Sequence, residues 1–274
     1  MLTLGVDLSG PPRAVFVDDA GVVTFREPSG TGQAIQQAAQ DARVGAVGVA
    51  IPEDATPAVA IAGAKVTRSA PGPAAVAAEA WVGSARGVRH AVCFSIGEHV
   101  YAGLLLDGRV WTGAHNRAGA AAWLALNPVE RQDYRKLGGL AAEVGFKGIA
   151  RRLSWRIQAG DQSAVLERAG DLEAITAAHV FDGARSGDGV AISVVRDTAR
   201  YIGMAIANFV ATIDPEVVVI AGAIAAAHDV LHDAVRQECT RRLPLQAMDS
   251  LRVEFSTLGD DAVAIGAARL AMPV

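Results

Sequence analysis

The positions of apolar and polar residues predict the same short unit twice along this chain. In both places an apolar strand runs into an Asp/Gly turn and a second strand follows, as "VFVDDAGVV" and "LLLDGRVW" show. The first unit is predicted as strands over 2–8, 14–18 and 22–26, and the second as strands over 91–95, 100–106 and 110–112. This repeat indicates that one strand-turn-strand unit is used in two halves of the fold.

Helices and strands alternate over the rest of the sequence. Helical spacing of apolar residues predicts helices over 31–43, 162–170, 175–186, 188–213 and 225–242, and a final helix over 261–271 that Asp260 or Asp261 would cap. Apolar runs predict buried strands at 46–51 and 214–222, and "LRVEFST" predicts one more strand. This alternation is typical of an α/β fold.

The composition excludes several classes of protein. The 274 residues are 51% hydrophobic, which allows a sizeable core in one large domain or in two lobes. The net charge is −4 and no run of Lys or Arg occurs, so we expect no nucleic-acid partner. No apolar run approaches the roughly 18 residues that cross a bilayer, and no basic leader is visible. We therefore expect a cytoplasmic protein without a membrane partner.

Cysteine and histidine patterns give no strong metal signal. Cys93 and Cys239 lie far apart without CxxC spacing, so we predict two buried thiols, and neither a disulfide framework nor a zinc ribbon. His228 and His232 stand at i and i+4 on one predicted helix face, a spacing that also occurs in zinc sites. Because no third ligand is in view, we interpret the pair as ordinary helix surface and expect no metal there.

Five segments, in their order and spacing, resemble the ROK family of sugar kinases and related repressors. They are "GVDLSG" with "FVDDAGVV", "GAVGVAIPE" (45–53), "GLLLDGRVWTGA" (103–114), "RYIGMAIANFVATIDPEVVVIAGAI" (200–224) and "LGDDAVAIGAARLA" (258–271). The resemblance covers nearly the whole chain. It is most specific in "IDPEVVVIAG" and "DDAVAIGAA".

The resemblance implies a two-lobed actin-like ATPase fold, which is a duplicated ribonuclease H-like α/β architecture with ATP and a sugar between the lobes. We expect the first lobe to comprise residues 1–112 and 260–274, and the second residues 113–259. Each copy of the repeated unit would contribute one phosphate hairpin to the cleft. Family members are commonly dimeric, so we expect a homodimer, and an active member would use ATP and magnesium.

The resemblance also implies which residues would bind the nucleotide. Asp7 keeps the strand position that helps to hold magnesium. The phosphate and adenine turns would contain Ser9, Gly10, Gly97, Glu98 and Gly222. However, the chain has Ser9-Gly10-Pro11-Pro12 where the family has Gly-Gly-Thr-Lys, and proline has no backbone N–H. Each charge-assisted contact that a phosphate loses costs about 1.5–3 kcal/mol.

A carboxylate replaces the hydroxyl of the second phosphate turn, because the family's Gly-Thr-Gly aligns with Gly97-Glu98-His99. If Glu98 faces the phosphates, like charges about 4 Å apart cost on the order of 4 kcal/mol, and if it turns to solvent this cost disappears. After Gly222, alanines replace glycines that would let the backbone approach a nucleotide.

The sugar side departs from the family pattern as well. Pro71 occupies the position of the family's catalytic aspartate, and proline cannot take a proton, so we expect no catalytic base there. Ala70 and Pro73 replace amide side chains that would hold the sugar. The nearby carboxylates that could substitute for the base are Glu53, Asp54 and Glu79, of which Glu79 is expected on a structural face of its helix.

The segment "GAHNRAGAAAW" has Ala120 and Trp123 where the family has a Glu-x-x-His pair. Trp123 can stack on a sugar ring or fill the core, and Asn116 is the second candidate for substrate binding. The family's Cys-x-Cys-Gly-x-x-Gly-Cys zinc loop is absent, because no cysteine lies between Cys93 and Cys239. We therefore expect no structural zinc.

Two hypotheses for the function follow. In the first, the chain is a non-catalytic member of the sugar-kinase fold that binds a small molecule, such as a sugar, or a protein partner in the cleft. In the second, it is an active ATP-dependent kinase of a sugar or amino sugar with altered site chemistry. A repressor is disfavoured, because residues 3–7 already form the first strand and a repressor of this family would carry a winged helix before it.

Overall fold

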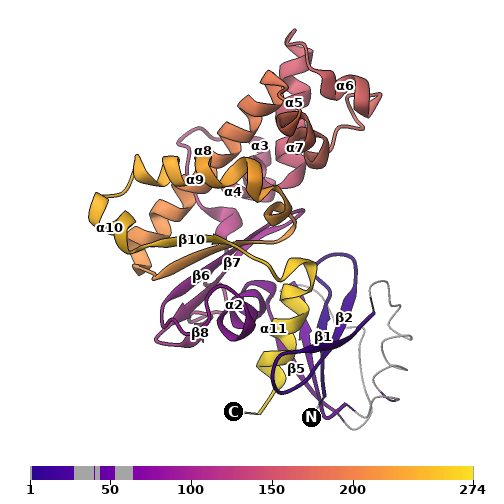
Figure 1. The fold of residues 1–274 in the computed structure, drawn as a ribbon, viewed down its shortest axis with the longest axis vertical. Coiled ribbons are helices and arrows are strands. Elements are labelled where there is room, and N and C mark those ends of the chain that lie inside the picture. The colour runs from indigo at the N-terminus through magenta and orange to yellow at the C-terminus, as the bar shows by residue number, and fades with distance from the viewer. Residues whose placement is uncertain (1, 28–39, 41–43, 53–63, 274) are drawn as a thin grey trace.

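Two five-stranded mixed sheets with the same strand order form the framework of the protein (Figure 1). The structure is a computed structural model that describes residues 2–27, 40, 44–52 and 64–273. The first sheet has the order β3-β2-β1-β4-β5, with β1 Thr3–Asp7, β2 Arg13–Val17, β3 Val23–Glu27, β4 Ala46–Ala50 and β5 Lys65–Ser69. The second sheet has the order β10-β9-β6-β7-β8, with β6 Ala91–Ile96, β7 Val100–Leu106, β8 Arg109–Trp111, β9 Val217–Ala221 and β10 Arg252–Phe255.

Each sheet begins with one copy of the repeated unit. In the first sheet β1, β2 and β3 are antiparallel, and β4 and β5 continue the sheet in parallel with β1. In the second sheet β6, β7 and β8 are antiparallel, and β9 and β10 continue it in parallel with β6. The repeat that the sequence predicts is therefore a repeat of sheet topology.

Strands on both sides of the expected lobe boundary at residue 112 belong to the second sheet. Strands β6, β7 and β8 hydrogen-bond within the second sheet, so residues 91–111 do not belong to the sheet that β1 begins. The reason is that β6 pairs in parallel with β9, a strand more than a hundred positions later in the sequence, and a pattern within residues 91–111 does not reveal that partner. The last helix, α11 Ala262–Ala271, packs against β1 and β4 of the first sheet, and the division into lobes stays a prediction.

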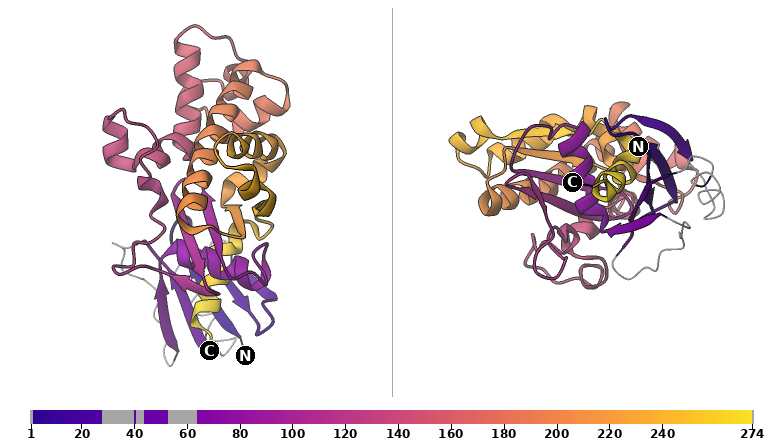
Figure 2. Two further views of the ribbon diagram at one scale, coloured as in Figure 1. Left: turned by 90° about the vertical axis from the view of Figure 1, so that its left-hand side faces the viewer. Right: turned by 90° about the horizontal axis from the view of Figure 1, so that it is seen from below.

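The helices fall between and above the sheets (Figures 1 and 2). They are α2 Pro71–Val82, α3 Gln132–Leu137, α4 Gly139–Val144, α5 Phe146–Gln158, α6 Ala164–Ala169, α7 Ala177–Arg185, α8 Gly189–Ile213, α9 His228–Thr240, α10 Leu245–Ser250 and α11 Ala262–Ala271. Helices α6, α7, α8, α9 and α11 match predicted helices closely, whereas β5, α3, α4, α5 and α10 were not predicted, and α2 was expected only as the helix of Glu79, without bounds. The helix expected over 31–43 lies, except for residue 40, outside the described residues.

Helices α2 and α11 form the layer between the two sheets (Figure 1). Helix α11 packs on β1 and β4, and α2 packs on β6 and β7. The contacts are close because small residues line them: a Cβ on Gly5 would lie 1.9 Å from the carbonyl oxygen of Ala264, and one on Gly266 would lie 1.7 Å from that of Ala74. The chain thus returns to its first sheet at its last helix.

The largest apolar core lies on the opposite face of the second sheet. There α4, α5, α7, α8 and α9 cover side chains of β6, β7, β9 and β10. Phe94 of β6 meets Phe209 of α8 edge to face, with ring centroids 5.8 Å apart. None of the helices in the described part of the chain is long and apolar enough to cross a membrane.

Candidate functional site

The turns of the two repeated units face each other across a cavity of about 190 Å³. Its walls come from the β1–β2 turn, the β6–β7 turn, the end of β9 and the segment that precedes α11. All the residues predicted to contact a nucleotide line it, namely Asp7, Ser9, Gly10, Gly97, Glu98 and Gly222. One hairpin turn of each sheet lies at this cavity. Residues from distant parts of the sequence therefore come together there.

Asp7 is the buried carboxylate of this cavity. It ends β1, is 7% exposed, and accepts hydrogen bonds from the backbone N–H of Ser9 at 2.8 Å and from its hydroxyl at 2.6 Å. Burial raises the pKa of Asp7, and the hydrogen bonds from Ser9 and the charge of Arg13 oppose that rise. A carboxylate in this position can bind a cation.

The β1–β2 turn has few backbone donors left for an anion. The N–H of Ser9 already donates to Asp7, and Pro11 has no N–H. Of the turn residues that line the cavity before the start of β2, only Gly10 has an N–H that remains for a ligand. The turn therefore lacks the row of N–H groups that holds phosphates in Gly-rich loops.

Glu98 lines the cavity but extends toward solvent. Its side chain is 60% exposed, and the Nζ of Lys147 lies 3.9 Å from its carboxylate. The turn that carries it is fixed by two backbone hydrogen bonds: Gly97 donates to His99, and Phe146 donates to Gly97. Glu98 thus lines the cavity and is exposed to solvent at the same time, so neither of the two alternatives excludes the other.

Five further polar residues line the same cavity and were not predicted to contact a ligand: Arg13, Ser95, His99, Tyr101 and Asp260. Arg13 forms an ion pair with Asp260, and burial raises the pKa of Tyr101 to about 12, while hydrogen bonds with Ser95 and Ser9 oppose that rise. Strand alternation could have placed Tyr101 and Ser95, because they are direct partners in the β6–β7 register. Nothing local in the sequence connects Arg13 with Asp260.

The charges of this cavity are mainly negative. The described lining residues include three carboxylates, Asp7, Glu98 and Asp260, and one guanidinium, that of Arg13. Arg13 is held at 2.7 Å by Asp260, so its charge is already compensated. The electrostatic balance of the walls favours a cation over an anion.

A second and larger cavity, of about 500 Å³, lies at the start of α2. Residues from β5, the first turn of α2, β8 and the segment after β8 line it, together with Leu270 of α11. Ala70, Pro73 and Asn116 are among them, so the predicted substrate residue Asn116 lies beside the two positions where the family pattern has amides. Pro71 is buried in the first turn of α2 and lines neither this cavity nor the smaller one.

Comparison with known proteins identifies the family. The ROK family model matches residues 73–273. This chain belongs to the ROK family.

Individual relatives agree with the family match. A glucokinase from Halalkalibacterium halodurans is 28% identical over 190 residues, which are 69% of this chain and 58% of that protein. A ROK family glucokinase from Streptomyces griseus, solved with glucose and AMPPNP, has a TM-score of 0.79 at 22% identity and covers 99% of both chains. A ROK family transcriptional regulator, a homologue of the Escherichia coli MLC protein, has a TM-score of 0.84 at 21% identity, over 98% of this chain and 77% of that one. The fold is therefore that of the ROK sugar kinases, the actin-like ATPase fold.

Trp123 does not fill the core, in contrast to one of its two interpretations. Its side chain is 60% exposed, in the short helix η1 Ala121–Trp123, and it lines neither the small nor the large cavity. It lies instead on a separate groove with Pro128 and Tyr134. The structure therefore separates Trp123 from Asn116, the other predicted substrate residue.

The carboxylates considered as replacement bases are not in either cavity as far as the structure describes them. Glu79 is fully buried in α2, where the backbone N–H of Ser84 donates to it at 2.9 Å and the hydroxyl of Ser256 also donates to it. Burial raises its pKa, against these two hydrogen bonds. Glu79 thus joins α2 to the segment after β10, as a structural residue. Glu53 and Asp54 lie outside the described residues.

The histidine pair and the cysteines show no metal chemistry in the described residues. His228 and His232 both face the ring of Phe255, and Asp229 pairs with Arg185. Cys93 and Cys239 are both buried, as predicted. Within the described part of the chain, no group of three or more His, Cys, Asp or Glu side chains is arranged to hold a metal ion.

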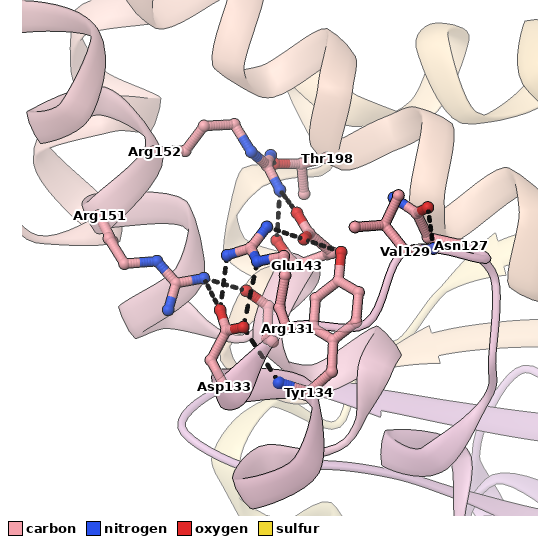
Figure 3. Close-up of polar contacts among 10 residues, drawn as sticks. Asn127, Val129, Arg131, Asp133, Tyr134, Glu143, Arg151, Arg152 and Thr198 are labelled. Atoms are coloured by element: carbon pink, nitrogen blue, oxygen red, sulfur yellow. Dashed lines mark hydrogen bonds and ion pairs between the residues drawn. The ribbon is translucent and has the colours of Figure 1, made fainter.

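An ion-pair network occupies the segment where the resemblance would place a zinc loop (Figure 3). Glu143 of α4 accepts hydrogen bonds from Arg131 at 3.0 Å, from Arg152 at 2.5 Å and from the hydroxyl of Tyr134 at 2.5 Å. Asp133 joins Arg131 to Arg151 of α5, at 2.6 and 2.9 Å. These contacts attach the segment before α4 to α4 and α5.

Proposed function

We propose that this ROK-family chain binds a small molecule in the cleft between its sheets without transferring a phosphoryl group from ATP. The observation that carries the proposal concerns the β1–β2 turn. The backbone N–H of Ser9 donates to Asp7 at 2.8 Å, and Pro11, which follows Gly10 in the cavity lining, has no N–H. Phosphoryl transfer depends mainly on donors that position and neutralise the phosphates. This turn offers one such backbone donor, from Gly10, to the smaller cavity.

Two further features support the proposal. The smaller cavity has three carboxylates and one guanidinium that is already paired, which disfavours the phosphates of ATP. On the sugar side, α2 begins with Pro71, and the one carboxylate of that helix, Glu79, is buried away from both cavities. A hexose hydroxyl in the larger cavity would therefore find no base among the described lining residues, and loss of a base removes roughly a factor of 10² to 10⁴.

A second candidate function is an active sugar or amino-sugar kinase that uses ATP and magnesium. It is favoured by Asp7, which is retained in the smaller cavity where a cation can bind, and by relatives that are named glucokinases. The chain spans 58% of the first of these relatives and 62% of the second.

A coupled kinase assay separates the two functions. We expect no turnover with glucose, mannose, N-acetylglucosamine or N-acetylmannosamine at millimolar sugar, ATP and magnesium. We also expect ATP with magnesium to leave the Tm unchanged, whereas a ligand at a hundredfold excess over its Kd would stabilise the fold by about 2.7 kcal/mol. Turnover that is proportional to protein concentration and is lost in Asp7→Ala would refute the proposal and establish the kinase.

Other properties belong to the same proposal. We infer that the protein forms a homodimer in solution, holds no structural zinc, is located in the cytoplasm and has no nucleic-acid partner. Sedimentation that finds only a 28.3 kDa species at micromolar concentration would contradict the dimer. One equivalent of zinc per chain, in protein purified without added metal, would contradict the second point. Salt-dependent binding to duplex DNA would contradict the last.

A further inference from the structure

The larger cavity has one charged residue among the described residues that line it, and that residue is a cation. Arg68 lies on β5, the edge strand of the first sheet, and is exposed. The other lining side chains are hydroxyls, one amide and apolar groups. Of these, Thr67, Ser69, Thr112 and Asn116 are polar. The described lining of this cavity is therefore opposite in charge to that of the smaller, acidic one.

Arg68 has no ion pair with any residue that the structure describes. By contrast, Arg13 and Arg26 of the same sheet pair with Asp260 and Asp261. An unpaired guanidinium has five N–H donors in a planar arrangement that matches a carboxylate or phosphate. Arg68 can therefore make such contacts without first breaking an existing ion pair.

The polar groups around Arg68 are suited to hydroxyls. Asn116 and Thr112 can each donate and accept hydrogen bonds, as a sugar hydroxyl requires. Ser69 has a buried Oγ without a hydrogen-bond partner in the described part of the chain, so a polar ligand atom that reaches it would satisfy it. No carboxylate among the described lining residues would repel an anion.

The size and the apolar wall of the cavity fit a small ligand. A volume of about 500 Å³ lies in the range of small-molecule pockets, roughly 300–1,000 Å³. Its apolar part includes Ile51, Val110 and Leu270. Such a surface can contact the C–H face of a sugar ring while the polar groups bind its hydroxyls.

We propose that the larger cavity binds a small polyhydroxylated anion, with its carboxylate or phosphate on Arg68 and its hydroxyls on Asn116 and Thr112. This inference rests on the proposed function, because it names the ligand class of the same cleft. The carboxylate of a sugar acid and the phosphate of a sugar phosphate share the chemistry that Arg68 recognises, and the experiment below distinguishes them.

Isothermal titration calorimetry with D-gluconate, D-glucose 6-phosphate, D-glucose and inorganic phosphate tests the proposal. We expect one or both of the first two to bind, and D-glucose to bind at least about tenfold more weakly, since it lacks the charge-assisted contact. Binding of gluconate alone identifies a sugar acid, and binding of the phosphate ester alone identifies a sugar phosphate. Equal affinity for D-glucose, equal affinity for inorganic phosphate, or no binding of either anion overturns the proposal.

Substitutions on β5 supply the matched control. Arg68→Met should weaken binding of the anion by on the order of 10- to 100-fold, and Arg68→Lys should restore part of it. Lys65→Met removes the same charge from the same strand at a position that does not line the cavity, and should leave the affinity unchanged. Equal losses in Arg68→Met and Lys65→Met would overturn the role of Arg68.

The outcome is independent of the kinase assay. Turnover of glucose with ATP would refute the non-catalytic function, and the calorimetric titrations would still decide separately whether the larger cavity binds an anion. A failure of both anions to bind, with no turnover, would refute this ligand class and leave the non-catalytic function intact.

Discussion

The Nη2 atom of Arg13 lies 2.7 Å from Oδ2 of Asp260, and this ion pair joins the start of β2 to the segment that precedes α11. Asp261 makes the equivalent contact with Arg26 of β3. The sequence suggested that one of these aspartates caps the last helix, but Asp261 stands at the N-cap without a side-chain hydrogen bond to the helix. Both carboxylates instead attach the last helix to the first sheet.

Arg13 and Asp260 should move the pKa of Asp7 in opposite directions when each is neutralised. The charge of Arg13 lowers the pKa of Asp7 and that of Asp260 raises it. We therefore expect a higher pKa in Arg13→Gln and a lower one in Asp260→Asn, measured by carbon NMR of the labelled carboxyl group. Because the pair is partly exposed, each change should alter the free energy of unfolding by no more than about 1 kcal/mol.

Arg26→Gln is the control, because it breaks the neighbouring ion pair with Asp261. Asp261 is not one of the groups that change the pKa of Asp7. A shift of the Asp7 pKa in Arg26→Gln as large as that in Arg13→Gln would contradict a specific effect of Arg13.

Asp7→Asn should stabilise the fold at neutral pH. Burial raises the pKa of Asp7 above its unfolded value, so the folded state holds the proton more tightly than the unfolded chain. Its stability therefore falls as pH rises from the unfolded pKa through the folded one, and stays lower above that window. We expect the stability gained in Asp7→Asn to grow from pH 4 to pH 7 in urea unfolding.

A gain that stays constant over that pH range would contradict the pKa argument for Asp7. So would a loss of stability at pH 7, because it would mean that the hydrogen bonds from Ser9 outweigh the cost of burial.

Gly266→Ala should destabilise the protein by roughly 1–3 kcal/mol, because its Cβ would lie 1.7 Å from the carbonyl oxygen of Ala74 where α11 crosses α2. Gly189→Ala is the matched change, since a Cβ there meets no atom within 4 Å, and it should be neutral or stabilising by up to about 1 kcal/mol. Guanidinium unfolding of both variants measures the difference. Equal stabilities would show that α2 and α11 can separate without cost.

Glu143→Ala should destabilise the helical part over the second sheet by roughly 3–5 kcal/mol, because Arg131, Arg152 and Tyr134 all lose their shared acceptor. The matched control is Glu130→Ala, which breaks an exposed pair with Arg135 and should change stability by less than about 1 kcal/mol. Urea unfolding followed by tryptophan fluorescence reports both. Comparable effects of the two substitutions would show that the network in Figure 3 does not support this segment.

Treatment with a strong chelator should leave the Tm unchanged if this network, and not a metal, attaches the segment before α4. Thermal unfolding with and without EDTA measures this. A fall in Tm that added zinc reverses would contradict the proposal that structural zinc is absent.

The sequence alone was sufficient for the elements with strong local patterns. Apolar strands bounded by Asp/Gly turns gave both repeated units, and the long apolar period gave α8, which starts after Asp188, whose side chain accepts from the N–H of Ala191 at 2.9 Å. β5 was missed because "KVTRS" has one apolar residue and forms a half-exposed edge strand. The start of helix α2 was not predicted because Pro71 and Pro73 resemble a turn, although proline is tolerated in the first turn of a helix.

Through its resemblance to the family, the sequence also named as nucleotide contacts six of the residues that line the smaller cavity, but not Arg13, Ser95, His99, Tyr101 or Asp260. Only the tertiary structure decided the rest. The pairing of Arg13 with Asp260, the burial of Glu79 and the exposure of Trp123 depend on contacts between distant segments, and so does the lack of an ion pair between Arg68 and any described residue. A local pattern fixes the backbone of an element and its apolar face, whereas the partner of a charged side chain is set by whichever segment packs against that element.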